Sequence, residues 1–231
     1  MTNFSKFEEK TKIFFKDKKL LTQAFVHRSF INENPSFDVG HNERLEFLGD
    51  AVLELIATDY LYKKYPESPE GEMTSYRSAL VNSIIISEVA ASLGMNDFLL
   101  LSRGEAKDNG KARQYILANT FEAFIGAIYL DQGYKAAESF VLEHLLVRTE
   151  EIVSKKLWRD SKSLVQEKAQ EYLGVTPSYK VTGETGPDHD KHFTVGLFLG
   201  KEMASVGHGK SKQEAEQKAA EEALRAKNWL D

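Results

Sequence analysis

Cysteine is absent from the 231 residues of the chain, and so is any long apolar run. The lack of thiols excludes disulfides and thiolate-rich zinc sites, and it fits a reducing compartment. The first residues, MTNFSKFEEKTK, lack the apolar stretch of about 7 to 15 residues that a secretory signal contains. No segment approaches the roughly 18 uncharged apolar residues of a membrane span. These absences predict a cytoplasmic protein with no membrane partner.

A strongly positive charge is missing as well, because the formal net charge is −5 at pH 7. This argues against a protein that coats nucleic acid by bulk electrostatics, so any RNA or DNA binding must come from local patches. The composition, 42% hydrophobic and 28% charged, is typical of a folded protein with a sizeable core. The length allows one large domain or two ordinary ones.

The chain changes its pattern near residue 154. Residues 1–153 show apolar positions at helical spacing with short polar breaks, which predicts an all-α domain. The apolar rhythm lapses around SKKLWRD, so residues 154–159 are expected to be a linker. Residues 160–228 read as a helix, three strand-like segments separated by turn residues, and a final helix. The sequence therefore predicts a multi-domain protein, with an all-α domain followed by a small α+β domain of α-β-β-β-α order.

The stretch HNERLEFLGD, His41 to Asp50, combines acidic residues with apolar bulk. At about 100° per residue, Glu43, Glu46 and Asp50 fall within about 60° of one another on a helix. The opposite side carries Leu45, Leu48, Val52, Leu55 and Ile56. Like charges at this spacing destabilise an isolated helix, so the acidic face needs either full solvation or a cation to offset it. A solvated surface stripe and a cation site both remain open at this point.

A second segment, ILANTFEAFIGAIYL, is almost wholly apolar but contains Asn119 and Glu122 one helical turn apart. Charge in such surroundings is costly unless it is paired. If this helix meets the acidic one, Glu46 and Asp50 would face Asn119 and Glu122 in an all-oxygen cluster of the kind that Mg²⁺ or Mn²⁺ prefers. Such ions hold phosphoryl groups and generate the attacking hydroxide in phosphodiester hydrolysis.

Several features outside these two segments carry weaker signals. Gly94 and Gly133 stand where two of the predicted helices would end. His27, in FVHRSF, is more typical of a structural helix residue than of a ligand. The segment SRGEAKDNGKARQ, residues 102–114, is expected to be a polar loop. Phe47 lies on the polar side of the acidic helix, which indicates either a partner surface or packing under a neighbouring loop.

The segments NERLEFLGDAVL and ILANTFEAFIGAIYLD, followed by the α-β-β-β-α tail, resemble bacterial ribonuclease III over nearly the whole chain. The motif ERLEFLGDA is highly specific to that family. The resemblance implies a homodimeric, double-strand-specific endoribonuclease that uses water and Mg²⁺, with Mn²⁺ as a substitute. It would cut both strands of double-stranded RNA to 5′-phosphate and 3′-hydroxyl ends, in ribosomal RNA processing and structured-RNA turnover.

The resemblance also implies roles for individual residues. The metal-binding positions of the family match Glu46, Asp50, Asn119 and Glu122 here, and Asp50 and Glu122 are the expected catalytic residues. Glu43 and Glu70 match further acidic positions that lie near the substrate. Phe47 matches the aromatic residue that inserts into a socket on the other subunit of the dimer.

Asn119 departs from the family pattern, which usually has Asp at this position. An amide oxygen can coordinate a hard cation, but it carries no net charge and cannot accept a proton as a carboxylate can. Three interpretations stay open: a natural variant with adequate metal affinity, a weakened nuclease that binds more than it cuts, and an engineered substitution. The alternative function is a dimeric scaffold that binds double-stranded RNA with weak or no cleavage.

Residues 160–228 resemble a double-stranded RNA-binding domain. Such a domain reads an A-form duplex across two minor grooves and the phosphates between them. Ser211 is a good N-cap for the last helix, so backbone amides, the helix dipole and two flanking lysines would converge on a phosphate. With the positions that the resemblance adds, the residues expected to bind RNA are Gln166, Glu167, His189, Lys210, Ser211 and Lys212.

Overall fold

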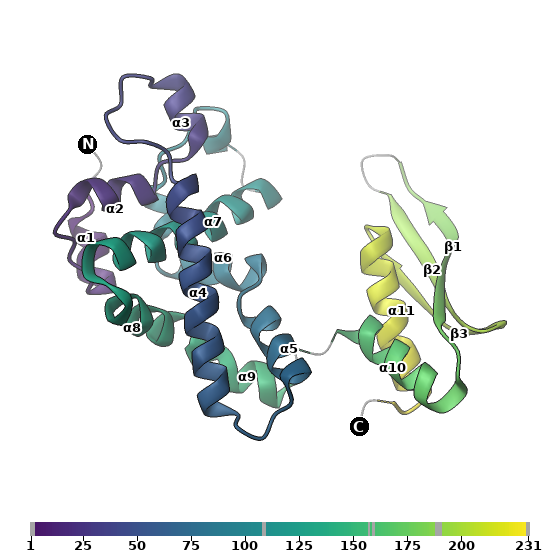
Figure 1. Cartoon of the computed structure of the whole chain (residues 1–231). Helices are drawn as coiled ribbons and strands as arrows, with labels where there is room; N and C mark the ends of the chain where they lie inside the picture. The colour runs from purple at the N-terminus through teal and green to yellow at the C-terminus, as the bar shows by residue number, and fades with distance from the viewer. Residues whose placement is uncertain (1–2, 108–109, 157, 159, 188–190, 230–231) are drawn as a thin grey trace. The chain divides into compact units, whose positions relative to one another are not determined.

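The computed structural model describes residues 3–107, 110–156, 158, 160–187 and 191–229. The chain divides into two compact units, Met1–Trp158 and Arg159–Asp231 (Figure 1). The first unit is built of helices, and the second is a three-stranded antiparallel sheet with two helices. The predicted fold class, an all-α domain followed by a small α+β domain, is confirmed.

The elements of the first unit follow one another with short connections. The α-helices are α1 (Ser5–Thr11), α2 (Lys18–Ala24), α3 (Arg28–Glu33), α4 (Glu43–Lys64), α5 (Glu70–Leu80), α6 (Ser83–Ser92), α7 (Lys111–Gln132), α8 (Tyr134–His144) and α9 (Thr149–Ser154). The short 3₁₀ helices are η1 (Met95–Phe98), η2 (Glu105–Lys107) and η3 (Leu146–Arg148). Within the described residues, no helix is long and apolar enough to cross a membrane.

Several helix ends have an identifiable chemical cause. The side chain of Asn82 accepts hydrogen bonds from the backbone amides of Ile84 and Ile85, which caps α6 at its start. Gly94 follows α6 with a φ of 76°, a backbone conformation that glycine adopts without strain. His27 caps α3, because its Nδ1 accepts from the amide of Ser29 at 3.3 Å. His27 therefore has a structural position at a helix start.

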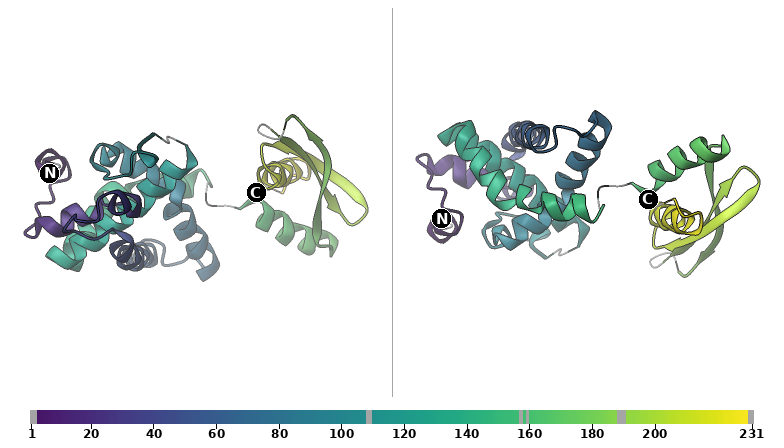
Figure 2. Two further views of the ribbon diagram at one scale, coloured as in Figure 1. Left: turned by 90° about the horizontal axis from the view of Figure 1, so that it is seen from above. Right: turned by 90° about the horizontal axis from the view of Figure 1, so that it is seen from below.

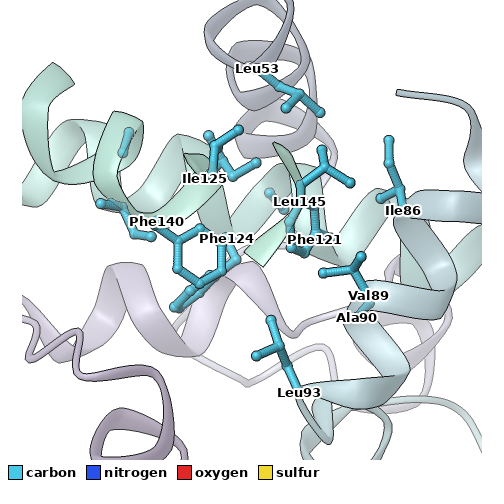
Figure 3. Packing of buried hydrophobic residues seen from close by; sticks show 14 of the residues in the cluster. Leu53, Ile86, Val89, Ala90, Leu93, Phe121, Phe124, Ile125, Phe140 and Leu145 are labelled. Atoms are coloured by element: carbon cyan, nitrogen blue, oxygen red, sulfur yellow. The ribbon is translucent and has the colours of Figure 1, made fainter. Parts of the chain in front are cut away.

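The core of the first unit surrounds α7. Phe121 and Phe124 on α7 and Phe140 on α8 are buried, and Figure 3 shows them among aliphatic side chains such as Leu53 and Ile86. Burying each such side chain is worth roughly 1.5–3 kcal/mol. A helix that is apolar nearly all round has to lie inside the domain, so any polar side chain on α7 needs a particular reason to be there.

Two glycines allow α4 and α7 to cross in close contact (Figure 1). A Cβ atom on Gly49 would lie 1.7 Å from the carbonyl oxygen of Glu122, and one on Gly126 would lie 2.3 Å from that of Leu45. No side chain fits at either position, so the two backbones touch there. This crossing places the polar residues of α4 next to those of α7.

Two sequence-based expectations differ from the structure. The helical angle of Leu55 predicts that it lies on the apolar side of α4, but it is 57% exposed, because it lies at the edge of the covered face, on which Leu53 and Ile56 are buried. The polar loop predicted for residues 102–114 is shorter, since α7 begins at Lys111. Arg113 is buried and donates to the side chain of Asn96 at 2.9 Å and to the carbonyl of Glu105 at 2.7 Å. These bonds explain why a charged residue can start a buried helix.

The second unit has the element order predicted from its sequence. It consists of α10 (Ser161–Leu173), β1 (Pro177–Thr185), β2 (His192–Leu199), β3 (Glu202–Gly209) and α11 (Lys212–Ala226), with strand order β1-β2-β3. Figure 2 shows both helices on the same face of the sheet. Buried alanines on α11 let it lie close to β3, where a Cβ on Gly207 would meet the backbone of Ala215 at 2.1 Å.

The two tryptophans, for which the sequence predicted no role, each pack on the hydrophobic core of one unit. Trp158, within the predicted linker 154–159, packs on the core of the first unit, and its ring centroid lies 4.8 Å from that of Tyr76. Trp229 is buried in the second unit together with Val165 and Leu224. In each unit, a tryptophan side chain thus covers apolar surface.

Candidate functional site

The acidic residues of α4 form a row along one face of the helix. Glu43, Glu46, Asp50 and Glu54 follow one another at spacings of three, four and four residues, which keeps them on neighbouring turns. Glu43 and Glu46 lie in the first turn, where the helix dipole favours negative charge. That effect falls off within a turn, so it does not offset the charge farther along the row.

Asn119 and Glu122 are the exceptions in the buried stretch of α7. All residues from Ile116 to Ile128 are buried except these two, which are only partly buried. They lie on the side of α7 that meets α4, because the backbone oxygen of Glu122 is the atom against which Gly49 packs. The structure therefore brings Asn119 and Glu122 to the same crossing as Glu46 and Asp50.

The electrostatics of the crossing show how close these groups are. Burial, followed by nearby carboxylates, chiefly Asp50 and Glu46, raises the pKa of Glu122 to about 7. Burial also raises the pKa of Glu46, and a hydrogen bond from the amide of Asn119 counteracts part of that change. The carboxylates thus act on one another across the two helices, and the cluster holds more negative charge than its surroundings stabilise.

Cations compensate the two ends of the acidic row but not its middle. Glu43 pairs with Arg28 at 3.3 Å, and the ring of His41 lies 3.7 Å away on the same carboxylate. Glu54 pairs with Arg77 of α5 at 2.9 Å. Within the described parts of the chain, no lysine, arginine or histidine forms an ion pair with the carboxylates between these ends. We call Glu46, Asp50, Asn119 and Glu122 the central cluster.

The central cluster suits a hard divalent cation by its chemistry. Its donors are carboxylate and amide oxygens, the ligands that Mg²⁺ and Mn²⁺ prefer, and a cation would relieve the repulsion that raises the pKa of Glu122. Among the residues that the structure describes, no three carboxylate, imidazole or thiol side chains are already gathered around one point as metal ligands. The fit to a metal therefore rests on the donor set and the uncompensated charge.

Glu54, Arg77 and Arg28 belong to the surroundings of the cluster and were not predicted from the sequence. A signal for Glu54 was present, since it continues the series Glu46 and Asp50 at the same four-residue spacing. The arginines gave no such signal, because Arg28 and Arg77 reach the row from other helices. Their position depends on tertiary packing alone.

Glu70, the further acidic position, lies at the start of α5. It is exposed, and its carboxylate accepts from the hydroxyl of Thr74 at 2.9 Å. Together with Thr58 and Arg77 it borders a hollow of about 180 Å³ between α4 and α5. Glu70 thus shares this hollow with Arg77, the residue that pairs with Glu54 of the acidic row.

Phe47 projects from α4 next to a hollow. Its side chain is 83% exposed, which is unusual for a phenylalanine in a folded domain. The hollow beside it has a volume of about 630 Å³ and is lined by leucines together with polar residues: Leu20, Leu45, Leu48, Leu130, Gln23, His41, Glu43 and Arg44. One face of the unit therefore carries both an apolar projection and a recess whose walls are partly apolar.

The predicted RNA-binding residues lie at separate places on the second unit. Gln166 and Glu167 are exposed on α10, whereas His189 lies outside the described residues. Ser211 caps α11, and its hydroxyl accepts from the amide of Glu214 at 3.1 Å. Lys210 and Lys212 flank this cap and are exposed.

The carboxylate of Glu214 lies at the start of α11. Glu214 was not among the residues expected to bind RNA. Glu214 accepts from the backbone amide of Lys210 at 2.8 Å and pairs with Lys218 at 2.8 Å. Ser211 and Glu214 occupy the two side-chain positions of a capping box, but the Glu214 carboxylate accepts from the amide of the residue before the N-cap. Lys212 lies 3.7 Å from Glu184 of β1. A phosphate approaching this helix would meet two lysines that have carboxylates nearby.

Comparison with known proteins agrees with both units. Residues 17–149 match the family described as ribonuclease-III-like, and residues 161–227 match the double-stranded RNA binding motif. Ribonuclease 3 of Borreliella burgdorferi is 44% identical over 97% of this chain and 91% of its own length. Ribonuclease 3 of Protochlamydia amoebophila is 46% identical over 91% of this chain and 86% of its own length.

Solved structures resemble the first unit. The nuclease domain of ribonuclease III from Campylobacter jejuni is 40% identical with a TM-score of 0.57, covering 65% of this chain and 97% of that domain. A second structure of that nuclease domain, described for flexibility in a region involved in dimer formation, is 41% identical with a TM-score of 0.56. It covers 61% of this chain and 94% of its own.

The helical unit with its acidic crossing and the small α+β unit together define a nuclease domain followed by a double-stranded RNA-binding domain. The chain belongs to the ribonuclease III family, as the motifs in its sequence predicted. Members of this family generally depend on a divalent metal ion.

Proposed function

We propose that this chain is a cytoplasmic endoribonuclease that hydrolyses phosphodiester bonds in both strands of double-stranded RNA. Its products would carry 5′-phosphate and 3′-hydroxyl ends, and its tasks would be ribosomal RNA processing and structured-RNA turnover. The observation that carries the proposal is the crossing of α4 and α7, where burial and neighbouring carboxylates raise the pKa of Glu46 and Glu122. Among the described residues, no lysine, arginine or histidine forms an ion pair with either carboxylate.

The residues of the central cluster would divide the work between binding the metal and handling a proton. Glu46, Asp50, Asn119 and Glu122 are the groups that would hold Mg²⁺, with Mn²⁺ as a substitute. A bound ion of this kind supplies an activated water and stabilises charge on the leaving oxygen. Asp50 and Glu122 are the proposed catalytic residues. The pKa of Glu122, about 7 without metal, allows this carboxyl to hold or release a proton near neutral pH.

A homodimer is part of the proposal. Phe47 and the hollow beside it occupy one face, and a two-fold interface requires a projection and its recess on the same surface patch. Two copies would then supply two clusters for the two strands of a duplex, with Glu43 and Glu70 as additional acidic positions near the RNA. The mass of the chain in solution tests this, and a monomer at all concentrations would remove the dimer from the proposal.

Cleavage of a long perfect RNA duplex with and without Mg²⁺ tests the function directly. The expected result is cutting of both strands with Mg²⁺ and none with a chelator. End-labelling of the products should find a 5′-phosphate and a 3′-hydroxyl. Binding without any cutting over the whole range of Mg²⁺ and Mn²⁺ concentrations would favour the scaffold function instead.

Asn119→Asp is expected to lower the Mg²⁺ concentration needed for half-maximal cutting by about tenfold. A carboxylate adds one negative charge to the site, and a gain of roughly 1.4 kcal/mol corresponds to tenfold in affinity. The measurement is the cleavage rate of both proteins over a Mg²⁺ titration. If Asn119 supports adequate metal affinity, both proteins reach similar maximal rates. No cutting by the Asn119 protein at any metal concentration, with activity restored by Asp, would contradict the active-variant interpretation.

Replacing both Lys210 and Lys212 by alanine is expected to weaken duplex binding uniformly across RNA sequences. Each lost phosphate contact reduces the slope of log affinity against log salt by roughly 1, so the double variant should lose up to about 2. Binding of one duplex at several salt concentrations measures the slope. An unchanged slope would contradict the phosphate role.

A further inference from the structure

The pair formed by Glu54 and Arg77 lies next to the central cluster and has no role in the mechanism above. Glu54 stands one helical turn beyond Asp50 on the acidic face of α4, so it would extend the cluster if its carboxylate were free. It is close enough to be among the charges that raise the pKa of Glu122. Arg77 comes from α5 and binds the Glu54 carboxylate through Nε at 2.9 Å.

The guanidinium of Arg77 is held along α4 by a second contact. Its Nη1 donates to the hydroxyl of Thr58 at 2.8 Å, and that hydroxyl donates to the backbone carbonyl of Glu54 at 2.7 Å. Two donors of one planar group thus contact side chains that are one turn apart on α4. The side chains of Arg77 and Glu54 are only 34% and 39% exposed, so the pair is partly shielded from solvent and salt.

Arginines therefore compensate the negative charge of the acidic row of α4 at its two ends. Arg28 compensates Glu43 at the start of the row, and Arg77 compensates Glu54 at its other end. The carboxylates of the central cluster lie between these two pairs and can attract a cation. If Arg77 were absent, the negative charge of the Glu54 carboxylate would attract a divalent ion at the crossing. If Glu54 were absent, the positive charge of Arg77 would repel that ion.

We propose that Arg77 is a positioning residue that sets the divalent-cation affinity of the central cluster by neutralising Glu54 and holding it out of the metal site. This rests on the proposed function, since it assumes that the central cluster binds the metal. The proposal predicts that removing Arg77 and removing Glu54 change the metal affinity in opposite directions. Removing either partner of a pair that only joins α4 to α5 would instead have the same effect.

Titration of Mg²⁺ or Mn²⁺ alone into the metal-free protein by calorimetry is the test. Arg77→Gln is expected to tighten binding and Glu54→Gln to weaken it, each by about tenfold, which is the size expected for one partly screened charge near a divalent ion. The double variant should return to within about twofold of the wild type. Arg77→Lys keeps the charge and should also stay within about twofold.

Arg148→Gln is the matched control. Arg148 pairs with Glu88 at 2.8 Å and is similarly exposed, but this pair joins η3 to α6. Its loss should leave metal affinity unchanged, and thermal unfolding of every variant shows whether the fold is kept. Shifts in the same direction for Arg77→Gln and Glu54→Gln, or shifts below twofold, would overturn the inference while leaving the proposed function intact. Equal divalent binding by the wild type and Glu122→Gln, or no binding by the wild type, would overturn the proposed function and this inference with it.

Discussion

Glu122→Gln is expected to abolish most RNA cleavage while leaving duplex binding unchanged. Removing a group that takes part in proton transfer costs about 10²- to 10⁴-fold in rate, and the loss of a metal-ligand charge adds to this. Binding should persist because the second unit and the outer surface of the first unit keep their charges. The measurement is the single-turnover cutting rate together with duplex affinity in a non-cleaving buffer.

The same variant has a predictable effect on stability when no metal is present. The pKa of Glu122 in the folded chain is about 7, above the ordinary value of 4.5. Between these values the folded chain keeps a proton that the unfolded chain has lost, so stability falls as the pH rises through this window and is level above it. The full shift corresponds to about 3 kcal/mol, which partial exposure reduces to about 1–2 kcal/mol.

Glutamine does not ionise, so the stability of the Glu122→Gln protein should lack this contribution to the decrease with rising pH. In metal-free buffer the wild type is expected to lose about 1–2 kcal/mol more than the variant between pH 5 and pH 8. Glu143→Gln, which removes an exposed carboxylate of α8, serves as the control in both measurements. If Glu122→Gln also lost duplex binding, Glu122 would be a structural residue. If it cut at the wild-type rate, Glu122 would lie outside the catalytic site.

Much of the site is predictable because helical spacing is a local property. The angles along α4 depend only on residue number, so the sequence alone assigns Glu43, Glu46 and Asp50 to one face. The apolar surroundings of Asn119 and Glu122 likewise indicate that α7 is buried and that these two residues need a polar partner. The family motifs then connect the two helices.

The parts that could not be predicted depend on contacts between distant segments. Arg77 reaches Glu54 only because α5 folds back along α4, and nothing in the sequence around Arg77 indicates that partner. Leu55 lies on the apolar side by its helical angle and is still exposed, because the neighbouring helices cover Ile56 and Ala57 beside it but not the edge of the face where Leu55 lies. In the second unit the strands were predictable from their alternation. The approach of Glu184 to Lys212 instead depends on the sheet, because Phe193 of β2 pairs with Glu184 and lies under the Lys212 ammonium.

Gly49→Ala is expected to destabilise the first unit by about 3 kcal/mol, at the upper end of what overpacking costs. In an isolated helix the same change would stabilise α4, since alanine is favoured over glycine by about 1 kcal/mol. The sign of the effect therefore shows which cause dominates. In the folded chain the new Cβ would lie 1.7 Å from the carbonyl oxygen of Glu122, so α4 and α7 must separate or the variant must unfold.

Separation of the helices would also move Glu46 and Asp50 away from Glu122, so any folded Gly49→Ala protein should bind divalent metal poorly and cut RNA slowly. Gly71→Ala is the matched control, because Gly71 is also helical but a Cβ there would meet nothing within 4 Å. Thermal unfolding of the three proteins should place Gly49→Ala roughly 10 °C below the wild type and Gly71→Ala at or slightly above it. A Gly49→Ala protein as stable and as active as the wild type would contradict the claim that backbone contact at this crossing assembles the site. The central cluster would then have to tolerate a wider spacing between α4 and α7.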